Sequence, residues 1–239
     1  MHLISSLFDA LFATRCVRCN RLGPSVCFDC WAHLGLRTRQ VTRFSPEGEL
    51  LTGYSAIDFD DSVSELMHHL KEMGISALAR PIGSALEGPL ASLLSRDSSA
   101  PVGPVWLVPV ASGVNSLQKR GYSPASLIGR ALLASASQTG GLRLLWGAGL
   151  VWRQRDVADQ AGLTVLARQT NLVGVMRASS RAANKSIVLV DDIVTTGSTL
   201  FETARALRAE GAHVVGFVTF AETILRSFAK SDAGDSKKV

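Results

Sequence analysis

Apolar residues recur along the chain in two patterns: short continuous runs, and stripes at helical spacing. The runs over Val105–Val110, Ile187–Val190 and His213–Phe220 are rich in β-branched residues, which predicts buried strands. Stretches of helical spacing alternate with these runs. The alternation predicts an α/β fold, doubly wound around a mostly parallel sheet with helices on both faces.

Capping residues predict where several helices begin and end. Ser62 and Glu65 have the spacing of a capping box, and so do Thr199 and Glu202. Ser123-Pro124 predicts another start, because proline favours the first helical position. The expected stops and breaks are Gly74, Gly211, and Pro81 and Pro89 within Ala77–Leu94. The predicted inward faces contain Val63, Leu66, Leu70 and Met73; Leu127, Ile128, Ala131 and Leu132; and Leu200, Ala204 and Leu207.

The chain divides into three predicted parts. Residues 1–48 contain all four cysteines and a short amphipathic helix within Met1–Thr14, whose apolar stripe is expected to pack on the protein's own body. Residues 49–226 carry the alternating strands and helices and form the predicted α/β domain. Between these two parts, Arg43–Gly48 is typical of a linker or turn. Residues 227–239 are small, polar and charged, which predicts a flexible tail.

Composition places the chain among globular proteins. It has 239 residues, of which 46% are hydrophobic and 19% charged, and its formal net charge is +5. The basic excess suits an anionic ligand, either a phosphate ester or nucleic acid, without choosing between them. No apolar run reaches the roughly 18 residues of a membrane-spanning helix, and no export signal is recognisable. The expected compartment is therefore the cytoplasm.

Acidic, hydroxyl and glycine residues follow one predicted strand directly. After Ile187–Val190 the chain reads Asp191-Asp192-Ile193-Val194-Thr195-Thr196-Gly197-Ser198-Thr199, and then a helix begins. Gly197 permits a positive φ, and the N–H groups of a helix N-terminus favour an anion. Two carboxylates beside such a cradle suit a ligand with vicinal hydroxyls at one end and a phosphate at the other, such as ribose 5-phosphate. The alternative is an ordinary turn followed by helix caps.

The four cysteines form two C-x-x-C pairs, Cys16 with Cys19 and Cys27 with Cys30. In a chain without an export signal, this pattern predicts tetrahedral thiolate ligation of a structural Zn²⁺, with iron as the main alternative. A disulfide framework is disfavoured by the expected compartment. The surrounding arginines form either a solvated basic face or a contact for nucleic acid: Arg15, Arg18, Arg21, Arg37 and Arg39.

The segment Ile187–Thr199 resembles, along its whole length, the 13-residue motif by which type I phosphoribosyltransferases bind 5-phosphoribosyl-1-pyrophosphate (PRPP). The resemblance implies that Asp191 and Asp192 contact the ribose hydroxyls and are the candidate catalytic residues. It also implies that the following turn holds the 5-phosphate. The residues that it assigns to PRPP in this segment are Val190, Asp191, Asp192, Thr195, Thr196, Gly197, Ser198 and Thr199.

Two cysteine pairs ahead of a PRPP motif resemble the ComF family, which is associated with competence and DNA uptake. Further segments that match this family are Leu70-Lys71, Val108–Val110, Lys119–Tyr122, and Gln160, Leu163, Arg168 and Asn171. The chain departs from the family's pattern at Ser123-Pro124, at Met176 and at Ala111-Ser112-Gly113.

Phosphoribosyl transfer requires that the charge on the departing pyrophosphate be offset, usually by Mg²⁺ with lysine or arginine. The candidates for this end of PRPP are Lys71, Arg120 and the loop residues Ala111 and Ser112 with Gly113, although either cation could equally be a solvated surface charge. Three functions are open. The chain is a Mg²⁺-dependent phosphoribosyltransferase, a non-catalytic PRPP or nucleotide sensor, or an adaptor that contacts single-stranded DNA or a DNA-uptake helicase.

Overall fold

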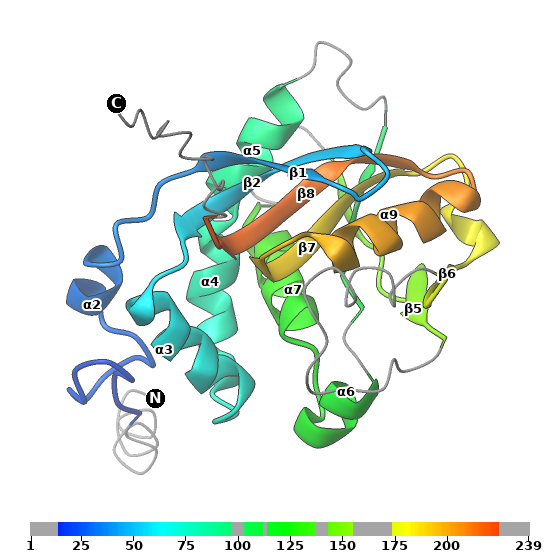
Figure 1. The fold of residues 1–239 in the computed structure, drawn as a ribbon. Helices are drawn as coiled ribbons and strands as arrows, with labels where there is room; N and C mark the ends of the chain where they lie inside the picture. The colour runs from blue at the N-terminus through cyan, green and yellow to red at the C-terminus, as the bar shows by residue number, and fades with distance from the viewer. Residues whose placement is uncertain (1–13, 97–102, 112–113, 137–142, 155–173, 225–239) are drawn as a thin grey trace, which may run out of the picture.

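The computed structural model describes residues 14–96, 103–111, 114–136, 143–154 and 174–224 (Figure 1). Its centre is a six-stranded sheet in the order β1-β2-β8-β7-β3-β4, in which β1 and β2 pair antiparallel and the other pairs are parallel. The predicted α/β class with a mostly parallel sheet is confirmed. The strands of this sheet are β1 (Arg39–Phe44), β2 (Leu50–Asp58), β3 (Val105–Pro109), β4 (Leu144–Trp146), β7 (Ser186–Val194) and β8 (His213–Glu222).

Helices cover both faces of the sheet, as the alternating pattern predicted. One face packs against α3 (Asp61–Lys71), α4 (Ala79–Ala85), α5 (Glu87–Ser95) and α7 (Pro124–Ala136). The other face packs against α9 (Ser198–Ala209) and the antiparallel pair β5 (Val151–Arg153) and β6 (Met176–Ala178) (Figure 1). In the part of the chain that the structure describes, the remaining helices are α2 (Phe28–Ala32), η1 (Ser76–Leu78), α6 (Val114–Arg120) and η2 (Ser180–Ala182).

Strand β7 is longer than predicted. Its apolar run ends at Val190, but the strand continues through Asp191 and Asp192 to Val194 because β8 beside it continues to pair as far as Glu222. Apolar content marked only the part of the strand that is covered on both faces. The acidic pair therefore lies within a strand, and the interpretation of these two residues as plain turn residues is wrong.

Both predicted capping boxes are wrong, because other partners take the side chains. Helix α3 is capped by Asp60, whose carboxylate accepts the N–H of Val63 at 2.8 Å, while the Ser62 hydroxyl accepts from Arg18. Helix α9 begins after Gly197. Glu202 does not cap it, because its buried carboxylate accepts from the N–H of Met176 at 2.9 Å and from Arg205.

The two prolines expected to break a helix instead lie in first turns. Pro81 is the third residue of α4 and Pro89 is the third residue of α5, where a missing N–H costs no intrahelical hydrogen bond. The break falls between them, at Leu86. Ser123 caps α7 as predicted, accepting the N–H of Ser126 at 3.3 Å. Met73 is exposed rather than inward, because α3 ends two residues earlier.

The segment Arg43–Gly48, expected to be a linker or turn, includes the turn of the β1–β2 hairpin. Ser45 closes this turn by donating its N–H to the carbonyl of Glu49 at 2.9 Å. The predicted division at residue 48 falls within the hairpin, so β1 pairs with the sheet of the following part. Hairpin pairing is a contact between neighbouring segments that a polar, proline- and glycine-containing stretch does not reveal.

The cysteine-containing segment packs on the same core as the sheet. Val26 and Leu34 are buried members of that core, and the ring of Trp31 stacks on Phe220 of β8 with centroids 6.1 Å apart. Arg18 fastens the segment to the start of α3 through the Ser62 hydroxyl at 2.8 Å. Loosening this segment would therefore expose part of the main core.

Some predicted elements lie outside the described residues. These are the N-terminal helix, apart from Thr14, and the tail at 227–239. Within the described ranges, no helix has the length and apolar character that crossing a bilayer requires.

Candidate functional site

The acidic pair lies at the carboxyl end of β7, beside β3 and β8 in the sheet. Successive side chains of a strand leave on opposite faces, but the two carboxyl groups are near enough for the charge of Asp192 to raise the pKa of Asp191. Asp192 lies on the side of α3, where its carboxylate is 2.9 Å from the ammonium of Lys71. The structure therefore brings together two residues that the sequence assigned to opposite ends of PRPP.

Lys71 is the last residue of α3, and its ion pair is largely shielded from water. Its side chain is 25% exposed and that of Asp192 is 14% exposed, so the attraction is stronger than between two surface charges. The interpretation of Lys71 as a freely solvated charge is wrong. A ligand phosphate approaching this edge would find a cation already held in place.

Asp191 has the most perturbed carboxyl group of the site. Burial, together with the charge of Asp192, raises its pKa to about 8 against the opposing effects of the Asp192 N–H and of Lys71. At neutral pH the ligand-free protein holds this carboxyl largely protonated. Hydroxyl donors or a cation arriving nearby would favour its ionised form.

The turn after β7 has the geometry of an anion cradle. Gly197 has φ +81° and precedes the first residue of α9, a conformation that strongly favours glycine. The hydroxyls of Thr196 and Ser198 are 2.7 Å apart, and Thr195 is exposed. The first N–H groups of a helix have no intrahelical partner. At α9 the N–H of Ser198 is directed to the Thr196 hydroxyl at 3.4 Å, and the helix start adds a partial positive charge.

Arg43 is a buried residue at this turn that sequence reasoning missed. It lies on β1, 152 residues away in the chain, and its Nε donates to the carbonyl of Thr195 at 2.7 Å. No pattern in the sequence around Arg43 predicts such a long-range contact. Arg43 is one of two arginines in β1 and shares the buried face of Val41, and this spacing of two residues was the one signal available.

The residues predicted for the pyrophosphate end are only partly described. Ala111 lies two residues after the end of β3, which is next to β7 in the sheet, whereas Ser112 and Gly113 lie outside the described residues. Arg120 does not contact the acidic pair, because its guanidinium is 2.6 Å from the carboxylate of Glu72. Nearby, the hydroxyl of Tyr122 donates to the carbonyl of Leu70. This segment thus holds the end of α3, which presents Lys71.

A second group of predicted residues cannot be placed at the site. Gln160, Leu163, Arg168 and Asn171 all lie outside the described residues, in the connection between β5 and β6. Met176, where the chain departs from the ComF pattern, is fully buried at the start of β6. Its N–H is the group that Glu202 binds.

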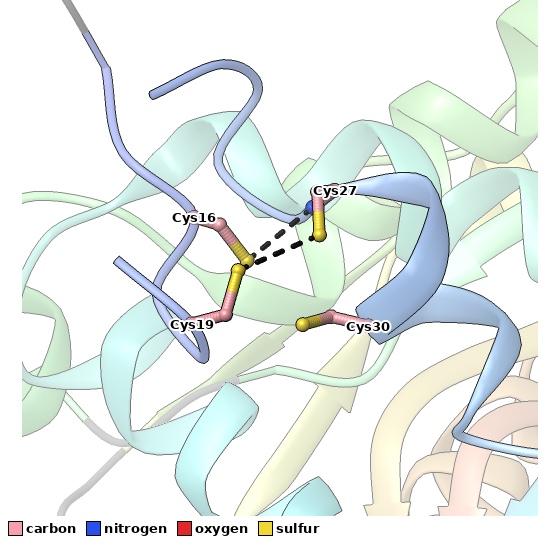
Figure 2. Close-up of side chains that lie close together, drawn as sticks. All are labelled: Cys16, Cys19, Cys27 and Cys30. Atoms are coloured by element: carbon pink, nitrogen blue, oxygen red, sulfur yellow. Dashed lines mark hydrogen bonds between the residues drawn. The ribbon is translucent and has the colours of Figure 1, made fainter. Parts of the chain in front are cut away.

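The four cysteines come together, as predicted. Their sulfur atoms all lie within 4.8 Å of one another, and Figure 2 shows Cys16 and Cys19 on one loop facing Cys27 and Cys30 at the start of α2. The Sγ atoms of Cys19 and Cys27 are 3.7 Å apart, which is close to the roughly 3.8 Å edge of a tetrahedron with metal–sulfur bonds of about 2.3 Å. The cluster therefore fits a metal ion held by four thiolates.

The local backbone prepares one of these thiols for ionisation. Burial raises the pKa of Cys16, but backbone N–H groups of Cys27, Cys19 and Arg18 outweigh that effect and bring it down to about 6. Hydrogen bonding among the thiols, with Cys27 first, raises the pKa of Cys30 to about 12. A divalent cation would favour the thiolate forms, because thiolates rather than thiols bind metals.

Acidic partners neutralise much of the basic face around the cysteines. Arg21 pairs with Asp29 at 2.9 Å, and Arg39 pairs with Asp58 at 2.8 Å. Arg18 is engaged by Ser62, Glu65 and the carbonyl of Cys30. Arg15, Arg21 and Arg37 are the exposed members of the five, and of these only Arg21 has an acidic partner among the ion pairs of the described residues, so the uncompensated positive charge lies on Arg15 and Arg37.

The chain is similar to a known protein family, to curated relatives and to solved structures. A family described as "Phosphoribosyl transferase domain" matches residues 116–236, just over half of the chain. The DNA utilization protein YhgH of Salmonella typhimurium (strain LT2) is 29% identical over 203 residues, covering 84% of this chain and 85% of that protein. YhgH of Escherichia coli (strain K12) is 28% identical with the same coverage.

A solved adenine phosphoribosyltransferase aligns with a TM-score of 0.39 and 14% identity, covering 82% of this chain and 90% of that one.

We expect Asp191→Asn to change how stability depends on pH. The folded wild type keeps the Asp191 proton up to about pH 8, whereas the unfolded chain loses it near pH 4. Between these values the folded state binds more protons than the unfolded state, so this group lowers the free energy of unfolding as pH rises. The variant lacks this dependence and should gain stability over wild type from about pH 5 to about pH 8 in urea unfolding.

The matched control is Asp61→Asn, which removes an exposed carboxylate from the first turn of α3. Its stability should follow the wild-type pH profile. If Asp191→Asn also follows that profile, Asp191 does not hold a proton at neutral pH.

Proposed function

Because the chain belongs to the phosphoribosyl transferase domain family, we propose that it binds PRPP at the carboxyl end of β7. The observation that carries the proposal is the arrangement at this edge: two carboxylates on the strand, followed within a few residues by a glycine-containing turn that opens α9. The predicted resemblance to the ComF family is confirmed by the family match together with the relatives at 28–29% identity.

Each end of the ligand has a proposed contact. The carboxylates of Asp191 and Asp192 would accept from the ribose hydroxyls. The 5-phosphate would lie on the turn, where hydroxyl and N–H donors meet the start of a helix. The residues proposed for the phosphate are Thr195, Thr196, Gly197, Ser198 and Thr199, with Val190 at the base of the site. Lys71 and the loop that starts at Ala111, including Ser112, would face the pyrophosphate.

Lys71 would exchange partners when the ligand binds. In the ligand-free protein its ammonium neutralises Asp192 at 2.9 Å. Ribose hydroxyls on Asp192 would compensate that carboxylate, which leaves the ammonium available for the pyrophosphate oxygens. Arg120 would act indirectly, because its ion pair with Glu72 stabilises the end of α3, and Lys71 is the last residue of that helix.

Transfer of the phosphoribosyl group would use these contacts in three ways. Binding energy from the 5-phosphate would fix the ribose, so that its C1 is held in line with an acceptor. Positive charge develops at C1 as the bond to pyrophosphate breaks, and the nearby carboxylates would stabilise it. Lys71 would offset the charge on the departing pyrophosphate. These roles make Asp191 and Asp192 the proposed catalytic residues.

Magnesium would arrive with the ligand. Among the described residues, the cysteines form the only group of three or more side chains able to hold a metal ion. Mg²⁺ keeps several waters and commonly binds through phosphate oxygens with few protein ligands, which is compatible with this edge of the sheet. When bound to the pyrophosphate, it would supply charge neutralisation beyond that of Lys71.

The cysteine cluster is proposed to hold a structural Zn²⁺. Four thiol ligands at tetrahedral spacing leave no open position for substrate, and the cluster lies on a segment that shares the core of the sheet. Iron is the alternative ion for four thiolates. Either metal would fix the fold of the N-terminal segment rather than take part in transfer.

A second candidate function is DNA handling without turnover. The relatives named DNA utilization protein YhgH share 28–29% identity with this chain over most of its length, which favours a role in the use of DNA. Arg15 and Arg37 offer exposed positive charge for single-stranded DNA or for a helicase partner. PRPP binding would then serve as a sensor. Release of pyrophosphate from PRPP in the presence of a panel of bases distinguishes an enzyme from a sensor.

We expect PRPP with Mg²⁺ to bind to the wild type and to bind at least about tenfold more weakly to Asp191→Ala/Asp192→Ala. The ribose hydroxyls lose charge-assisted acceptors in this variant. Calorimetric titration measures both affinities directly.

Asp58→Ala provides the comparison, because Asp58 is also an acidic residue at the carboxyl end of a strand in the same sheet but pairs with Arg39. It should bind PRPP like the wild type. Equal affinity of all three proteins would contradict a ribose site at the acidic pair.

Removal of the metal is expected to lower the melting temperature of the whole described fold by roughly 5–10 °C, because the cysteine segment contributes to the main core. A chelator should cause this shift, and added Zn²⁺ should reverse it. Elemental analysis of the purified protein distinguishes zinc from iron. An unchanged melting temperature after complete removal of the metal would contradict a structural role of the metal ion.

Single-stranded DNA binding, if it involves the cysteine segment, should weaken in Arg15→Glu/Arg37→Glu. The loss of two phosphate contacts should also reduce the slope of log affinity against log salt by about 1.4. Arg21→Gln is the control, since the Arg21 guanidinium is already paired with Asp29. No binding by wild type at low salt would remove this candidate function.

A further inference from the structure

Arg43 links an edge strand to the turn proposed to hold the 5-phosphate. Its Nε donates to the carbonyl of Thr195 at 2.7 Å. The other guanidinium nitrogens donate to the carbonyl of Thr42 at 3.1 Å, to the carbonyl of Thr223 at 3.0 Å and to a carboxylate oxygen of Glu222 at 3.1 Å. One side chain thereby joins β1, the end of β8 and the turn after β7.

The ion pair with Glu222 is buried. The side chain of Arg43 is 9% exposed and that of Glu222 is 11% exposed. The positive charge is thus compensated within the protein, and four of the five N–H donors of the guanidinium already have acceptors. Arg43 is therefore not placed as a direct phosphate ligand, and its role at the turn must be indirect.

The aliphatic part of Arg43 lies directly under the glycine of the turn. A methyl group added to Gly197 would be 3.2 Å from both Cβ and Cγ of Arg43, and Gly197 has φ +81°. Close by, the N–H of Thr223 donates to the carbonyl of Val194 at 2.9 Å. The turn is thus contacted by the Arg43 side chain at Gly197, and it is held by hydrogen bonds to two carbonyls that precede the glycine, those of Val194 and Thr195.

We infer that Arg43 is a positioning residue, which holds the turn in the conformation that presents its hydroxyls and the first N–H groups of α9 to a phosphate. The inference rests on the proposed function. Only arginine has a planar fork of donors able to reach three carbonyls and a carboxylate together. A turn that is already ordered loses less conformational freedom on binding, so its affinity for phosphate is higher.

The inference has a specific consequence for ligands. Loss of Arg43 should weaken ligands held through the 5-phosphate and should not weaken ligands held at the pyrophosphate end. Ribose 5-phosphate and inorganic pyrophosphate with Mg²⁺ are suitable probes, because each occupies one end of the proposed site. A role confined to the stability of the fold would not separate the two probes.

The test replaces the buried pair as a unit, in Arg43→Met/Glu222→Leu. Exchange of a buried ion pair for apolar residues of similar volume is often neutral for stability, whereas removal of one partner leaves a buried charge. We expect a melting temperature near that of wild type, about tenfold weaker binding of ribose 5-phosphate, and binding of pyrophosphate within about twofold. Isothermal calorimetry of the full chain measures both ligands.

Arg208→Met is the matched control. Arg208 also bridges α9 and the β1–β2 hairpin, through an ion pair with Glu49, but it lies near the far end of the helix. This variant should bind both probes like the wild type. Arg43→Lys serves as a second variant, because it keeps the charge and loses the fork, and it should show the same selective loss.

The outcomes separate this inference from the proposed function. Wild type that binds neither probe overturns the proposed function, and the inference with it. Wild type that binds ribose 5-phosphate, beside a folded double variant that binds it equally well, overturns only the role of Arg43. An equal loss of both probes also overturns it. If the double variant does not fold, Arg43→Lys decides by the same criteria.

Discussion

Strand β7 is hydrogen-bonded to β8 along one edge and to β3 along the other, and the candidate site depends on this pairing. The pairing with β8 continues past the apolar run, with Asp191 opposite Thr219 and Ile193 opposite Ala221, while the N–H of Asp192 donates to the Asp191 carboxyl at 2.9 Å. Strand alternation then separates the two carboxylates, and Asp192 lies toward Lys71. Three residues after the strand ends, Gly197 turns the chain into α9. A rigid strand thus positions the acidic residues, and the turn follows at a fixed distance.

The position of Asp191 at the end of β7 lowers the stability of the ligand-free fold when its carboxyl group is ionised. Burial and the neighbouring carboxylate hold the pKa of Asp191 at about 8, so its ionised form is unfavourable in the ligand-free protein. Strongly shifted groups of this kind are frequent at functional sites, because a ligand can supply the interactions that the protein withholds. The buried pair of Arg43 and Glu222 is different, since both charges are satisfied within the protein. The site therefore combines Asp191, whose ionised form would be stabilised only by a ligand, with the Arg43–Glu222 ion pair, whose charges neutralise each other.

Much of the fold followed from local pattern. Val105–Val110, Ile187–Val190 and His213–Phe220 were identified as strands because covered strands are apolar along their length, and Ser123-Pro124 marked a helix start by its backbone chemistry. The predictions failed where distant partners competed. Glu202 binds the N–H of Met176, 26 residues away, instead of capping its own helix, and Asp60 rather than Ser62 caps α3. The predicted helix breaks at Pro81 and Pro89 were wrong for another reason: the sequence does not tell whether a proline lies in the first turn of a helix or in its middle.

The sequence by itself determined three strands of the sheet, the start of α7, the cysteine spacing and the acidic–glycine segment, because each is encoded within a few consecutive residues. Only the tertiary structure decided that Lys71 faces Asp192, that Arg120 binds Glu72, and that Arg43 supports the turn. Those contacts join elements up to 152 residues apart. Their existence depends on the order of strands in the sheet and on which helix covers which face, and these are settled by burial of the whole core rather than by any local pattern.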